Sequence, residues 1–143
     1  MTEHFIFSGH DTEDLAAEYG TPLYVFSEDI LLSKAASLKN AFESAGADYE
    51  INYAGKAFLN TAVCRILDRE GLSLDTASGG ELYTALAAGF DPARITLHGS
   101  NKSERELREA LEAGIGRIVV DSEDGLARID ALTREYAIRA EIL

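Results

Sequence analysis

The hydrophobic positions of this chain change period repeatedly, between short runs typical of strands and spacings of three and four residues typical of helices. From residue 49 onward the alternation is regular. It predicts five apolar strands, at 49–54, 72–75, 95–98, 117–121 and 139–143. These strands begin 22 to 23 residues apart, and helical spacing of leucine, isoleucine and alanine fills the intervals. The pattern therefore predicts repeated strand and helix units around a parallel sheet.

Glycine and serine mark the expected helix ends. Gly71, Gly89 and Gly114 follow the last apolar positions of three predicted helices. Residues 78–81 (SGGE) and 103–106 (SERE) fit the capping box, in which a serine and a glutamate three residues later satisfy helix-start amides. Both signals support helices between the strands.

The first 46 residues are organised differently. Asp11 is expected to cap a short helix that ends at Gly20, and residues 23–26 (LYVF) are predicted to form a strand. A second helix, with apolar residues at helical spacing from 31 to 42, closes at Gly46. We therefore divide the chain into an N-terminal segment, 1–46, and a β/α region, 47–143.

Two architectures share this rhythm. A five-stranded doubly wound sheet would be complete at this length, whereas an eight-unit β/α barrel would be represented by about four and a half units. Periodicity leaves both open. The chain stops within an apolar strand, at 140–143 (AEIL), without a turn or polar tail. This ending favours a truncated (β/α)8 barrel.

Composition narrows the classes of function. Thirteen Lys and Arg against twenty-five Asp and Glu give a net charge of −12, without a cationic cluster, which argues against nucleic acid or an anionic membrane as partner. No apolar run approaches the roughly 20 residues of a membrane helix, and no signal peptide is evident, so we expect a cytoplasmic location. Cys64 is the single cysteine, expected in the core, and no metal-ligand spacing predicts a metal site.

Candidate chemistry lies at the carboxyl ends of the strands, where parallel β/α folds place their sites. Lys56 follows the first strand between Gly55 and Ala57, small neighbours that leave room for a ligand, and residues 58–59 (FL) could exclude water. A desolvated amine there would be a nucleophile toward an aldehyde. The alternative is a lysine that extends from the strand end into solvent.

The next two strand ends add an acid and an imidazole. Asp75 could hydrogen-bond a cofactor or orient Lys56, or it could only end its strand and support the turn. His98 could bind substrate or cofactor at the rim. Gly79 and Gly80, at a helix start, could approach an anion.

These motifs resemble a known family. Residues 53–57 (YAGKA) and 71–82 (GLSLDTASGGEL) closely resemble the N-terminal barrel region of the fold-type III pyridoxal-phosphate decarboxylases, most of all the diaminopimelate decarboxylases. The resemblance extends through three further sets of residues: 88–103, 119–122 (VVDS) and 20–25 (GTPLYV). The motifs follow one another in the family's order and spacing.

The resemblance implies an alanine racemase-like β/α barrel in which Lys56 forms an internal aldimine with pyridoxal phosphate. It places Asp75 near the lysine and cofactor and His98 on the rim. The implied activity is decarboxylation of meso-2,6-diaminopimelate to L-lysine by a homodimer. Ornithine or arginine as substrate, and a non-catalytic half-barrel with a binding or regulatory role, are the alternatives.

Some family features are missing. The family histidine that stacks on the cofactor belongs to a His-x-Gly-Ser motif, and residues 98–100 (HGS) lack its spacer. Residues 124–125 (DG) stand where the family usually has Glu-Leu. We expect the second half-barrel, with its phosphate loop, and the β domain to be absent from this chain. We also expect exposed apolar surface at the terminal strands and an inactive isolated polypeptide.

Overall fold

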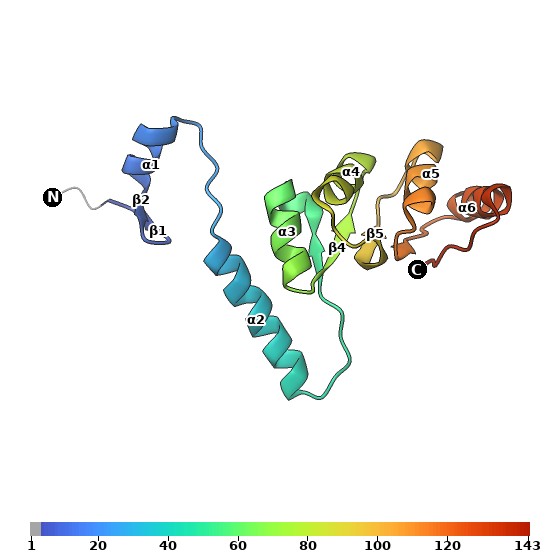
Figure 1. Cartoon of the computed structure of the whole chain (residues 1–143), viewed down its shortest axis with the longest axis horizontal. Coiled ribbons are helices and arrows are strands. Elements are labelled where there is room, and N and C mark those ends of the chain that lie inside the picture. The colour runs from blue at the N-terminus through green and yellow to red at the C-terminus, as the bar shows by residue number, and fades with distance from the viewer. Residues whose placement is uncertain (1–3) are drawn as a thin grey trace. The chain divides into compact units, whose positions relative to one another are not determined.

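The computed structural model describes residues 4–143, which form parts of two compact units, Met1–Tyr49 and Glu50–Leu143 (Figure 1). The division falls close to the boundary predicted at residue 46. No described helix combines the length and hydropathy needed to span a membrane. Each unit is described separately below.

Two helices dominate the first unit, and both were predicted. Helix α1 (Thr12–Tyr19) begins at Asp11, whose carboxylate accepts a hydrogen bond from the Glu13 amide at 2.8 Å. The Asp11 cap and the end at Gly20 are therefore confirmed. Helix α2 (Glu28–Ser44) has Ala45 as its C-cap, and Gly46 follows with a φ of 62°.

The strand predicted at residues 23–26 is wrong. These residues form no ladder, and their large side chains are exposed, Tyr24 to 95%. An apolar run becomes a strand only when a neighbouring strand pairs with it, and none of the described strands pairs with residues 23–26. The strands of this unit form an unpredicted antiparallel hairpin instead, β1 (Ile6–Phe7) with β2 (His10–Asp11).

The second unit contains a parallel sheet whose strands follow chain order. The strands are β3 (Asn52–Ala54), β4 (Ser73–Thr76), β5 (Ile95–Leu97) and β6 (Arg117–Ile118). The helices that follow them are α3 (Thr61–Arg69), α4 (Gly79–Ala88), α5 (Glu104–Ala113) and α6 (Glu123–Tyr136). Figure 1 shows these helices one after another along the sheet, from green to red. All four predicted strand and helix units are confirmed, with shorter strands.

The strand order decides between the two predicted architectures. A doubly wound sheet reverses direction at a switch point, whereas a barrel adds each strand beside the previous one. The order β3-β4-β5-β6 contains no reversal. Right-handed crossovers in one constant direction place every helix on the same face of the sheet. The described sheet is therefore part of a barrel.

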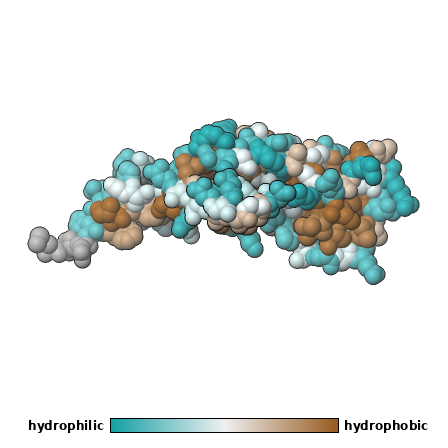
Figure 2. All heavy atoms as spheres, turned by 90° about the horizontal axis from the view of Figure 1, so that it is seen from below, coloured by the Kyte–Doolittle hydropathy of each residue, from teal (hydrophilic) through white to brown (hydrophobic). Residues whose placement is uncertain are grey.

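The strand predicted at 139–143 is reduced to an isolated bridge at Ile142. Ile142 forms an isolated parallel bridge with Ile118, supported by a 3.1 Å hydrogen bond from the Leu143 amide to the Ile118 carbonyl. Ile142 and Leu143 remain 48% and 75% exposed. One face of the molecule shows a large hydrophobic patch toward the end that carries the C-terminus (Figure 2). The expected apolar surface at this terminal strand is confirmed.

The two faces of the sheet differ in polarity because successive side chains alternate between them. Leu74, Ile95 and Leu97 are fully buried among apolar helix residues. Cys64 is also fully buried, and burial raises the pKa of its thiol, so its predicted core position is confirmed. The described helix residues with at most 1% exposure are Cys64, Leu67, Leu82, Ala85, Leu107 and Ala110. This layer between sheet and helices is the core of the unit.

The opposite face is polar. Arg117 extends across it, and its Nη1 atom lies 2.6 Å from Oε2 of Glu50, which precedes β3. The Arg117 guanidinium, followed by the Ser73 hydroxyl, lowers the pKa of the Glu50 carboxyl. Polar residues therefore occupy the side that a closed barrel would enclose.

Glu106 joins the starts of two neighbouring helices. Its Oε2 accepts the amide and hydroxyl of Ser103 at 2.8 and 2.7 Å, which completes the predicted capping box of α5. Its Oε1 accepts the Gly79 amide of α4 at 2.8 Å. The second capping box is only half correct, because Glu81 accepts the Ala77 amide instead of closing on Ser78. One carboxylate thus satisfies orphan donors of both helices.

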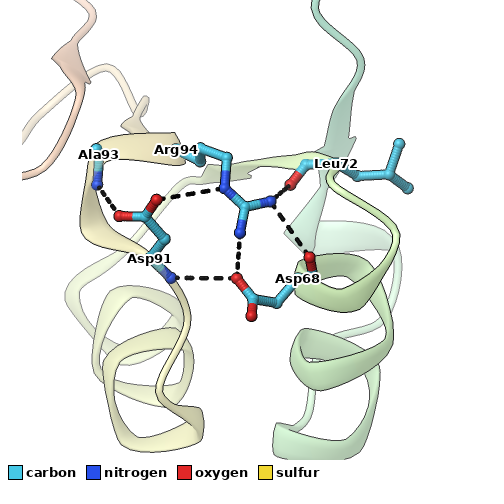
Figure 3. A network of polar contacts seen from close by, with 5 residues as sticks. All are labelled: Asp68, Leu72, Asp91, Ala93 and Arg94. Carbon is cyan, nitrogen blue, oxygen red and sulfur yellow. Dashed lines mark hydrogen bonds and ion pairs between the residues drawn. The ribbon is translucent and has the colours of Figure 1, made fainter.

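An arginine network lies at the end of the sheet where the strands begin (Figure 3). The Arg94 guanidinium donates to the Leu72 carbonyl at 2.8 Å and pairs with the Asp68 carboxylate. Asp91 lies 3.5 Å from Nε of Arg94 and caps the Ala93 amide at 3.0 Å. The planar guanidinium therefore links the end of α3 to the turn before β5.

We expect Glu106→Gln to destabilise the protein expressed from the entire reading frame by about 1 kcal/mol at neutral pH. The Ser103 hydroxyl, the Ser103 amide and the Gly79 amide lower the pKa of Glu106. The carboxylate's contribution is therefore complete above the unfolded pKa of about 4.3 and is lost as the pH falls through the lower folded value. Urea unfolding at several pH values measures the difference between variant and wild type. A difference that stays constant into acid, or equals that of the exposed-site control Glu112→Gln, contradicts the assignment.

Replacing Arg94 by lysine should cost about 1–3 kcal/mol, because a lysine cannot donate to the Leu72 carbonyl and the Asp68 carboxylate in the same planar arrangement. Urea unfolding of the same full product measures the loss. Arg105→Lys is the matched control, since Arg105 is 86% exposed and pairs only along its own helix with Glu109. Equal effects of the two substitutions would show that the network adds nothing beyond a surface ion pair.

Candidate active site

The three residues predicted from strand ends lie at one edge of the sheet. In the parallel register Ala54 pairs with Asp75, and Asp75 pairs with Thr96. Lys56 and His98 each lie two residues beyond one of these partners. Asp75 therefore occupies the middle strand, with the lysine-bearing segment on one side and the histidine-bearing segment on the other.

Lys56 lies in a single 3-10 turn, Gly55–Ala57, directly after β3. The Tyr53 hydroxyl donates to the Phe58 carbonyl at 2.9 Å and so ties together the two ends of this turn. The lysine side chain is exposed, and no hydrogen bond or ion pair engages its amine within residues 4–143. The predicted shielding is wrong in this structure, because Phe58 is itself 40% exposed. The amine is therefore accessible to a carbonyl compound.

Gly55 fills a tight position between the lysine turn and the next strand. A Cβ atom there would lie 3.0 Å from the Asp75 carbonyl oxygen and 3.2 Å from Oε2 of Glu81. The space beside Lys56 that the sequence assigned to a ligand is occupied on this side by β4 and α4. The glycine instead lets the lysine turn pack directly on the strand that carries Asp75.

Glu81 is a site residue that the sequence assigned only to a helix cap. Its carboxylate accepts the Ala77 amide at 2.8 Å and lies against Gly55. The signal was present in residues 78–81, but it predicted a bond within the helix start. The structure instead places this acid between α4 and the lysine turn.

Asp75 has one carboxylate oxygen without a hydrogen bond. Its Oδ1 atom is buried, although the whole side chain is 26% exposed. Nδ1 of His98 lies 3.3 Å from this oxygen, without the alignment of a hydrogen bond. The sequence did not indicate that these two side chains lie together, and Asp75 retains an unused acceptor at the rim.

The anion site suggested at the paired glycines is wrong. The Gly79 amide already donates to Glu106, as described above. A pocket of about 420 Å³ lies at this helix start, and both Glu106 and Glu109 line it. Arg105 also lines this pocket but pairs with Glu109, so acidic groups outnumber basic ones and disfavour a phosphate group at this helix start.

A smaller pocket, of about 60 Å³, lies between the loop after β5 and the start of α6. Lys102, Asp121 and Arg128 are among its polar lining residues. Its volume suffices for about two water molecules and is far below the several hundred Å³ of a cofactor pocket. The candidate site therefore remains the open edge formed by Lys56, Asp75 and His98.

Comparisons with known proteins agree with this geometry. Residues 29–143 match the model of the pyridoxal-dependent decarboxylase family, pyridoxal binding domain. The chain is 48% identical over 140 residues to diaminopimelate decarboxylase of Bacillus subtilis, an alignment that covers 98% of this chain and 32% of that protein. The chain thus spans about a third of the length of the curated relatives it matches.

Solved structures show the same similarity. Diaminopimelate decarboxylase of M. jannaschii in complex with L-lysine superposes with a TM-score of 0.84 and 33% identity, covering 99% of this chain and 33% of that one. The lysine/ornithine decarboxylase of Vibrio vulnificus in complex with cadaverine gives 0.78 and 26% identity, covering 92% and 34%. The chain therefore belongs to the pyridoxal-dependent decarboxylase family, within its pyridoxal-binding domain.

Proposed function

We propose that this chain provides the lysine-bearing part of a cytoplasmic, homodimeric diaminopimelate decarboxylase, which converts meso-2,6-diaminopimelate to L-lysine. The observation that carries the proposal is the unengaged Lys56 amine at the end of β3, next to the strand that holds Asp75. Among the solved structures, the identity of 33% to diaminopimelate decarboxylase of M. jannaschii exceeds the 26% to the lysine/ornithine enzyme, which supports the choice of substrate.

The residues at this edge fit pyridoxal phosphate. The accessible amine of Lys56 suits the aldehyde of the cofactor, and the unused oxygen of Asp75 offers an acceptor beside it. When bound, pyridoxal phosphate supplies the electron sink that amino-acid decarboxylation needs. The protein's contribution is to attach and orient the cofactor.

Each residue has a separate task in this proposal. Lys56 would hold the cofactor through its amine, the nucleophilic group at this edge. Asp75 would accept a hydrogen bond from the cofactor or from Lys56 through its unused Oδ1 atom. Gly55 and the Tyr53 hydroxyl hold the lysine turn against β4, so the amine approaches from a fixed direction.

The first test is covalent trapping. Incubating the protein expressed from the entire reading frame with pyridoxal phosphate and then borohydride should fix one pyridoxyl group on Lys56, as located by peptide mass spectrometry. Lys56→Arg should abolish the label because a guanidinium is not a nucleophile at neutral pH. Lys34→Arg, a change on the exposed surface of α2, is the control. Labelling that survives Lys56→Arg would overturn the assignment.

The second test concerns the substrate. The same protein, loaded with pyridoxal phosphate, should release CO₂ from meso-diaminopimelate with a kcat/KM at least about a hundredfold above the values for ornithine or arginine. A pocket that pairs the extra carboxylate of diaminopimelate loses that charge-assisted bond with the other substrates. A preference for ornithine or arginine would support the decarboxylase activity but contradict diaminopimelate as the substrate. Trapping at Lys56 without any CO₂ release would favour the non-catalytic alternative.

A further inference from the structure

We propose that His98 is a positioning residue that acts through Asp75: its imidazole holds the Asp75 carboxylate at the lysine-bearing edge of the sheet. The role in cofactor attachment rests on the proposed function, whereas the contact itself does not. Nothing in the proposed chemistry requires His98 to touch the substrate.

The unsatisfied oxygen of Asp75 is the first observation. A buried acceptor without a hydrogen bond is costly, and such atoms are rare in folded proteins. Nδ1 of His98 is 3.3 Å from this Oδ1 atom. A small rotation of either side chain would align the two atoms, and hydrogen bonds of this kind often tighten only when a site is filled.

The backbone of His98 is the second observation. Its amide donates to the Thr76 carbonyl at 2.7 Å and so extends the β4–β5 ladder one residue past β5. Gly99 follows with a φ of 97°, and a Cβ there would lie 2.9 Å from the Ala77 carbonyl oxygen. Only glycine allows this turn, which fixes the histidine from its C-terminal side. The ring is 55% exposed, yet it extends from a fixed point.

Two other charged groups at this edge, Glu81 and Lys102, already have partners. Glu81 accepts the Ala77 amide at 2.8 Å, and Nζ of Lys102 donates to the Gly99 carbonyl at 2.5 Å. Lys56 follows β3, on one side of β4, whereas His98 follows β5, on the other side. Among the described residues His98 is therefore the side chain suited to hold Asp75 from the side away from the lysine.

The test is a double-mutant cycle in the protein expressed from the entire reading frame. Pyridoxal phosphate is titrated into cofactor-free protein, and its Kd is followed by absorbance. His98→Ala should weaken binding about tenfold, the order expected for loss of a hydrogen bond to a charged group. His98→Asn, whose amide nitrogen replaces Nδ1, should restore most of the affinity. His98→Ala should have no further effect when Asp75→Ala, which removes the acceptor, is already present.

A cofactor-independent measurement separates this inference from the proposed function. In protein without pyridoxal phosphate, the shifts in urea midpoint caused by His98→Ala and Asp75→Ala should fail to add in the double variant. Asn101→Ala, in the same loop, should add normally to Asp75→Ala. Additive shifts overturn the contact, and equal effects of His98→Ala on Kd in both Asp75 backgrounds overturn the positioning role. Absence of trapping at Lys56 refutes the proposed function, while the coupling in unfolding still decides the contact.

Discussion

The register of the parallel strands is the constraint on which the second unit depends. Ala54, Asp75 and Thr96 lie level on three neighbouring strands. Because side chains alternate, this register sends Leu74 and Leu97 into the helix layer and leaves Asp75 on the polar face. A slip of one residue in β4 would bury the carboxylate and expose the leucine. Core and candidate site are thus consequences of the same hydrogen-bond pattern.

The two edges of this sheet use their polar groups differently. At the end of the sheet where the strands begin, Arg94 contacts Asp68 and the Leu72 carbonyl, and this network joins neighbouring strand-helix repeats. At the edge where the strands end, Lys56 and one oxygen of Asp75 are left unused. Satisfied polar groups lower the energy of the fold, whereas unsatisfied ones are available to a ligand. This asymmetry fits the placement of sites in β/α barrels.

The sequence predicted those parts of the structure that local patterns control. Hydrophobic periodicity predicts the helices α1 to α6, and Asp11 is a local capping signal. The positions of Lys56, Asp75 and His98 just after or at the strand ends also follow from the sequence pattern. Interactions between neighbouring strand-helix repeats could not be predicted from the sequence. The hydrogen bond from Gly79 to Glu106 joins residues 27 positions apart, and no local motif indicates it. Residues 23–26 failed for the same reason, since an apolar run specifies a strand only when a partner edge exists.

The exposure of Lys56 explains why the site cannot be understood from the lysine alone. Desolvation would activate the amine, but four parallel strands form a sheet with open edges, and Phe58 does not cover the side chain. What the described residues supply is direction: Gly55 packs the turn on β4, the Tyr53 hydroxyl ties its ends, and Asp75 stands on the adjacent strand. Orientation of a nucleophile raises the reaction rate by many orders of magnitude only when the protein also holds the other reactant in place. The proposed chemistry therefore belongs to a complete barrel, in which this edge provides the point of attachment.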